Sequence, residues 1–153
     1  MNIQIQLPGV RLGPVEADGV IQGKGLYRVS NIVDLTNLSS VETGWPYGVH
    51  DRAKFICRSS SVWALRMSVT TAIGRRVWHI KDRPVLADAT GPFGSPISDS
   101  TRTQIVEGVT EVLTVIYAPA GALDAALEVA AEKQAARLCA FSGASGTRTC
   151  IIG

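Results

Sequence analysis

Hydrophobic and polar residues alternate most regularly in the middle of the chain, over Val62–Thr71. The alternation puts four apolar side chains on one face and four small or basic ones on the other: Trp63, Leu65, Met67 and Val69 against Ala64, Arg66, Ser68 and Thr70. This period of two is typical of a strand with one buried and one open face. After the short connection Ala72–Gly74, Arg75–Lys81 continues as a second strand, with Trp78 and Ile80 on its apolar side. The pattern predicts an antiparallel hairpin with an apolar face and a basic, hydroxyl-bearing face.

Shorter strands are predicted on both sides of this hairpin. Asn2–Leu7 alternates and Tyr27–Leu35 is rich in β-formers, so the N-terminal part reads as short strands with glycine turns, beginning with a hairpin. Ala87–Thr103 has little periodicity and is predicted to be a long inter-strand loop, a kind of loop that is often functional. Thr103–Tyr117 returns to strand.

One helix is predicted, over Ala120–Ala140. It is rich in alanine, has apolar residues at helical spacing and carries acids before bases, as the helix dipole favours. Gly143 is the expected stop. The tail, Ala144–Gly153, is either loose or ends in a short closing strand at Thr149–Ile152.

These elements predict one α+β domain over residues 1–153. Its expected architecture is an N-terminal hairpin and an antiparallel sheet with the C-terminal helix packed on one face, completed by dimerisation. A chain of 153 residues with 46% hydrophobic residues can bury a sizeable core. No stretch approaches the ~20 apolar residues of a membrane span, and the N-terminus lacks the features of a signal peptide, so no membrane association is expected.

The charges of the chain are strongly segregated. The run Arg52–Arg83 holds eight of the fifteen basic residues and only one acid, Asp82, giving +7, whereas the remaining residues sum to −5. Such asymmetry is typical of a surface that binds a polyanion. The alternative is a solvated, arginine-rich sheet face with no partner.

The open face of the hairpin carries the predicted binding residues. Arg66, Arg75 and Lys81 are placed to meet phosphates, and Ser68, Thr70 and His79 to hydrogen-bond sugars or bases. Cations beside small hydroxyls on a flat sheet suit RNA, whose unpaired bases splay onto protein surfaces. The near absence of acids on this face favours RNA over a merely solvated surface.

Catalytic and metal-binding patterns are not found. Neither His50 nor His79 stands in a triad context, so no enzyme activity, cofactor or small-molecule substrate is expected. Cys57, Cys139 and Cys150 are odd in number and widely spaced, which argues against a zinc site and for free thiols. An inter-subunit disulfide stays open for Cys150.

Two segments resemble the coat proteins of single-stranded RNA bacteriophages. Val62–Pro84 (VWALRMSVTTAIGRRVWHIKDRP) is similar to the central hairpin of that family. Glu111–Leu127 (EVLTVIYAPAGALDAAL) is similar to its last strand running into the helix. Together the two segments cover about a quarter of the chain.

The resemblance implies a homodimer that assembles into an icosahedral shell around genomic RNA. By position, Arg66, Ser68, Thr70, His79 and Lys81 would line the inner face of the sheet, and helices would cover the opposite face. Tyr117 would stack on an RNA base, or its side chain would instead point into the core. The protein would be made in the cytoplasm of a bacterial host and reside in the virion.

The function expected from the sequence is therefore a capsid protein that self-assembles and binds RNA. Two alternatives remain. One is another phage structural module, a decoration or tail protein whose basic hairpin contacts protein, and the other is a small enzyme or ligand-binding barrel. The sequence does not reveal the shell geometry or a preferred RNA hairpin.

Overall fold

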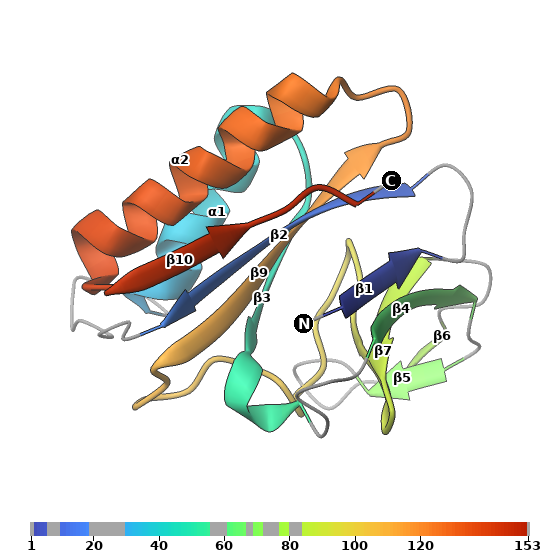
Figure 1. The fold of residues 1–153 in the computed structure, drawn as a ribbon. Helices are drawn as coiled ribbons and strands as arrows, with labels where there is room; N and C mark the ends of the chain where they lie inside the picture. Colours follow the sequence, from blue (N-terminus) through green and yellow to red (C-terminus); the bar gives the residue numbers. More distant parts are fainter. Residues whose placement is uncertain are drawn as a thin grey trace.

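The computed structural model describes residues 2–5, 10–18, 30–55, 61–66, 69–71, 77–79 and 84–152. Within these residues the chain forms two four-stranded sheets, a separate two-stranded pair and two long helices. Figure 1 shows the helices together on one side of a sheet and the other sheet on the opposite side. The fold is α+β, as predicted.

The sheet beneath the helices is antiparallel, with strand order β10-β2-β9-β3. Its strands are β2 (Val10–Asp18), β3 (Tyr47–Asp51), β9 (Glu111–Pro119) and β10 (Gly146–Thr149). β9 lies at the centre, and residues 112–118 of it are buried. A strand covered on both faces needs a continuous apolar run, which explains why its sequence does not alternate.

Two helices cover one face of this sheet. In α1 (Asn31–Thr43), the Ser30 hydroxyl accepts the Val33 N–H at the start and Gly44, at φ 69°, ends the helix. In α2 (Asp124–Ser142), Gly143 ends the helix, also at φ 69° and as predicted. The core beneath them includes Ile32 of α1, Leu127 and Leu138 of α2, and Val112 and Ile116 of β9.

One glycine allows α2 to approach the sheet closely. A Cβ atom on Gly13 of β2 would lie 2.8 Å from Leu127 Cδ1. Any larger residue would therefore require the Leu127 side chain to shift.

The second sheet has the order β1-β4-β7-β8 and packs on the face of β9 that the helices leave open. Its strands are β1 (Asn2–Ile5), β4 (Ser61–Arg66), β7 (Pro84–Asp88) and β8 (Gly91–Gly94), with β1 parallel to β4. Leu86 and Phe93 meet Leu113, Val115 and Tyr117 in a second core cluster, and Phe55 joins them. The remaining strands, β5 (Val69–Thr71) and β6 (Val77–His79), pair with each other.

Several sequence predictions about the secondary structure and the packing are wrong. Residues 31–43 form a helix although Tyr27–Leu35 suggested a strand, and β1 and β2 lie in different sheets instead of forming a hairpin. The predicted loop Ala87–Thr103 begins with the β7–β8 hairpin, and the closing strand comes at Gly146–Thr149 instead of Thr149–Ile152. The helices pack against the sheet that contains β2 and β9, and not against the sheet that contains Trp63.

Candidate functional site

The predicted RNA-binding residues fall in three places. Arg66 ends β4, while Thr70 and His79 lie in β5 and β6. Ser68, Arg75 and Lys81 lie outside the described residues. The strand Val62–Thr71 is divided, because β4 pairs with β1 and β7 whereas β5 pairs with β6.

The β5–β6 hairpin forms as predicted, but in a different register. Thr70 is opposite Trp78, and Val69 is opposite His79. The predicted basic face requires Thr70 and His79 to lie on the same face of the hairpin. In the observed register they lie on opposite faces, because the pairing is shifted by one residue. The RNA-binding role of these residues stays a prediction.

Tyr117 lies in the core cluster between the sheets, with 6% of its surface exposed. The sequence left open whether this residue stacks on RNA or points into the core. The structure places it in the core, because Leu113, Val115 and Tyr117 share the face of β9 that meets the second sheet. A ring buried in this way is not available for stacking on a base.

Two members of the basic run serve the fold. Arg52, in the short helix Arg52–Lys54 after β3, bonds Glu16 at 2.7 Å and Glu111 at 3.0 Å. Lys54 Nζ lies 3.5 Å from Asp51 Oδ2. Their charges are therefore compensated within the chain, and the other six basic residues of the run, within residues 58–83, have side chains that the structure does not describe.

The same holds for the other basic side chains that the structure describes. Each of them lies within ion-pair distance of a carboxylate of the chain: Arg102 of Asp88, Lys133 and Arg137 of Glu42, and Arg148 of Glu16. Acids outnumber bases in this part of the chain. The described side chains therefore carry a net negative charge and include no cluster of cations that would attract a polyanion.

The most unusual site among the described residues is a buried polar cluster between the two sheets, built from His50, Asp99 and Tyr117. His50 of β3 is fully buried, and its Nδ1 lies 3.1 Å from the Thr103 hydroxyl. Its Nε2 lies 3.6 Å from Asp99 Oδ1, which is beyond hydrogen-bond distance. His50 Nε2, Asp99 Oδ1 and the Tyr117 hydroxyl have no hydrogen-bond partner among the described residues.

Two glycines make room for this cluster. A Cβ atom on Gly48 would lie 3.0 Å from His50 Nε2, 3.2 Å from Asp99 Oδ1 and 3.4 Å from the Tyr117 hydroxyl oxygen. A Cβ atom on Gly94 would lie 2.6 Å from His50 Cε1. The three unpaired polar atoms thus converge on one point beside the backbone of β3.

Burial favours the uncharged form of all three groups of the cluster. Desolvation raises the pKa of Asp99 to about 7, although the hydrogen bond from the Val49 backbone lowers it in part. Desolvation, together with the positive charge of Arg102, lowers the pKa of His50 to about 3. Burial and the nearby Asp99 charge raise the pKa of Tyr117 well above its ordinary value.

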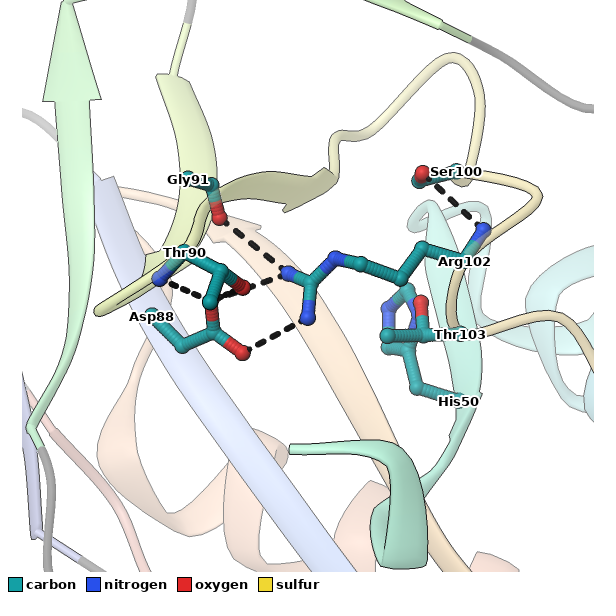
Figure 2. Close-up of polar contacts among 7 residues, drawn as sticks. All are labelled: His50, Asp88, Thr90, Gly91, Ser100, Arg102 and Thr103. Carbon is teal, nitrogen blue, oxygen red and sulfur yellow. Dashed lines mark hydrogen bonds and ion pairs between the residues drawn. The ribbon is translucent and has the colours of Figure 1, made fainter. Parts of the chain in front are cut away.

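An ion pair supports the cluster from the side. Figure 2 shows Arg102 reaching Asp88 with two nitrogens, both at 2.9 Å, and the Gly91 carbonyl at 3.2 Å. Burial alone would raise the pKa of Asp88, but the hydrogen bonds from Arg102 and Thr90 outweigh it and lower the pKa. The guanidinium also lies 5.8 Å from the centre of the Phe93 ring, whose edge packs against His50. Arg102 therefore fixes the loop that carries Asp99 and Thr103.

Among the described residues there is no group of three or more His, Cys, Asp or Glu side chains that could hold a metal ion, and neither of the long helices is long and apolar enough to cross a membrane. Cys139 and Cys150 are exposed free thiols, as the sequence predicted.

No known protein family and no curated protein matches the sequence. Among solved structures, the fold is similar to an N-terminal fragment of the phenylalanyl-tRNA synthetase β-subunit from Pyrococcus horikoshii, with a TM-score of 0.66 and 15% identity. The similarity covers 97% of this chain but 51% of that fragment, so the chain spans about half of its structural neighbour. At this level of identity the likeness concerns the fold.

Proposed function

We propose that this chain is an RNA-binding protein whose contact surface is the basic segment 58–83. The observation that carries the proposal is the segregation of charge. Six basic residues stand against Asp82 in this segment, whereas every lysine and arginine elsewhere whose side chain the structure describes lies within ion-pair distance of a carboxylate. A phosphate backbone is attracted to uncompensated cations, and an acidic body orients the molecule so that this segment faces the RNA.

Two forms of this function differ in assembly. In the form that the sequence resemblance implies, the chain is a non-enzymatic phage coat protein that dimerises, builds an icosahedral shell in the host cytoplasm and lines it with genomic RNA. In the other form it binds a discrete RNA, and the tRNA synthetase fragment of similar fold supports this form. A phage decoration or tail module would use the same basic segment for a protein contact and would bind no RNA.

Expression and size-exclusion chromatography separate these forms. A coat protein should elute as megadalton particles that absorb more strongly at 260 than at 280 nm. A discrete RNA-binding protein should elute as a small species that binds added tRNA with a salt-dependent affinity. A small species with no affinity for RNA would refute both forms and leave the protein-contact module.

The contact surface is tested by removing two of its cations. Arg66→Ala combined with Lys81→Ala should weaken RNA binding. It should also reduce the slope of log affinity against log salt concentration by up to about two, since each lost phosphate contact lowers this slope by about one. Lys133→Ala is the matched control, because Lys133 is exposed on α2 and lies beside Glu42. Equal affinities for both variants would show that the segment is not the contact surface.

A further inference from the structure

The free edge of β3 is covered by a loop instead of a strand. β3 pairs with β9 on one side only. On its other side, the Asp51 N–H donates to the Thr103 carbonyl at 2.8 Å and the Val49 N–H donates to the Asp99 carboxylate. The loop Ser95–Thr103 therefore supplies the acceptors that a neighbouring strand would provide.

This loop is folded on itself and attached at both ends. The Ser95 hydroxyl donates to the Ser98 carbonyl at 2.9 Å and accepts the Ser98 N–H at 3.1 Å. The Ser100 N–H donates to the Phe93 carbonyl at 2.7 Å. Between these attachments, the Asp99 side chain is inserted beside β3, with 19% of its surface exposed.

The surroundings of the Asp99 carboxyl group favour its neutral form. From β3, His50 Nε2 faces it at 3.6 Å, and from β9 the Tyr117 hydroxyl is close enough to feel its charge. The nearest arginine of the loop, Arg102, is bonded to Asp88 of β7. No described lysine or arginine forms an ion pair with Asp99, so its ionisation would leave a buried charge without a counter-ion.

We propose that the loop Ser95–Thr103 is a pH-sensitive latch on β3, held most firmly while Asp99 is protonated and opened more readily as Asp99 ionises. Release exposes the edge of β3 and moves the Asp99 side chain into solvent, while His50 stays packed against β8. The proposal rests on the geometry of this loop and does not depend on RNA binding. The pKa of about 7 for the closed carboxyl group places the control in the physiological range.

The pH dependence of release follows from the two pKa values of Asp99. In the closed loop the carboxyl group holds its proton up to about pH 7, whereas a solvated aspartate releases it near its ordinary pKa of 3.8. Opening therefore releases one proton between these values, and the opening equilibrium rises about tenfold per pH unit from pH 4 to pH 7. Above pH 7 both states are ionised, and the equilibrium becomes flat.

Hydrogen exchange read at single amides by NMR tests the latch. In the wild type, the protection factor of the Val49 amide should fall about tenfold per pH unit between pH 4.5 and 6.5 and level off above pH 7. The Val115 amide, in the central strand β9, reports openings of the sheet itself and serves as the internal control. In Asp99→Asn, which keeps the shape but cannot ionise, the Val49 protection factor should be independent of pH over this range.

Two results would overturn the proposal. One is a Val49 protection factor in the wild type with the same pH dependence as that of Val115. The other is a steep fall that persists in Asp99→Asn. The wild-type profile decides the matter by itself if the variant fails to fold.

Discussion

The pKa values of His50 and Asp99 are displaced in opposite directions, and together they predict how the free energy of unfolding depends on pH. Between about pH 4 and pH 6.5 the folded protein holds one proton on the pair, carried by Asp99. The unfolded chain also holds one proton in this range, but on His50, because the ordinary pKa values are 3.8 for the aspartate and 6.5 for the histidine. Equal proton numbers in both states mean that the pair adds almost no pH dependence to the free energy of unfolding.

Removing either partner should reveal the contribution of the other. In Asp99→Asn the remaining His50 has a folded pKa below its unfolded value, so the unfolded chain binds more protons and the unfolding free energy falls as the pH falls from 6.5 towards 3. In His50→Gln the remaining Asp99 has a folded pKa above its unfolded value, so stability is lost as the pH rises from 4 to 7. Both shifts arise first from burial, so each persists without its neighbour.

The expected effect is about 1.4 kcal/mol per pH unit in each variant, with opposite signs. On going from pH 6.5 to pH 4.5, Asp99→Asn should lose about 2.5 kcal/mol relative to the wild type, and His50→Gln should gain about the same. Urea unfolding at pH 4.5, 5.5 and 6.5 measures these differences, and Glu128→Gln on the exposed face of α2 controls for the change in net charge. Profiles of both variants that run parallel to the wild type would refute the assignment of this proton to a buried pair.

Two substitutions around the cluster test its packing and its ion pair. Gly94→Ala places a methyl group 2.6 Å from the His50 ring and should lower the free energy of unfolding in urea by on the order of 2 kcal/mol. Gly121→Ala, where the added methyl group meets nothing within 4 Å, should lower it far less. Equal losses in the two variants would contradict the close contact at Gly94. Arg102→Lys should lower the free energy of unfolding by about 2 kcal/mol, because one ammonium group cannot replace two hydrogen bonds to a buried carboxylate. It should also raise the pKa of Asp88, which NMR titration measures. An unchanged titration would show that the ion pair does not hold this pKa down.

The elements that the sequence predicted well are those with a strong local signal. The helix over 124–142 combines alanine-rich periodicity with a terminal glycine, and the central strand over 111–119 is a dense run of β-formers. In both cases the local preference agrees with the tertiary environment, so periodicity was sufficient.

Helix α1 was missed because its β-branched residues suggested a strand. Ile32 and Val33 have weak helix propensity, but they lie on a helix that packs against α2 and β3, where tertiary contacts outweigh propensity. The signals that could have found this helix were its ends, since Ser30 is an N-cap residue and Gly44 a terminal glycine.

The polar cluster could not be predicted from sequence spacing. His50 and Asp99 are separated by 49 positions and lie on a strand and a loop that meet only after both sheets have formed. Tyr117 was a candidate for the wrong reason, because an aromatic residue on a strand has the same local sequence whether it faces RNA or a second sheet. Only the packing of β7 and β8 on β9 buries the face that carries Tyr117.

Asp99 also allows local opening to be distinguished from global unfolding. Global unfolding exposes His50 as well as Asp99, so the proton passes from one to the other and the free energy hardly depends on pH between 4 and 6.5. Release of the loop alone moves Asp99 into solvent while His50 stays beneath β8. One proton is therefore lost on opening, and the opening equilibrium constant rises steeply with pH. In the wild-type protein, the pair should therefore add almost no pH dependence to the free energy of urea unfolding. Under the same conditions, the protection factor of the Val49 amide should fall steeply as the pH rises. If both profiles were flat, His50 would have to leave the core together with the loop, and the latch would be only a part of global unfolding.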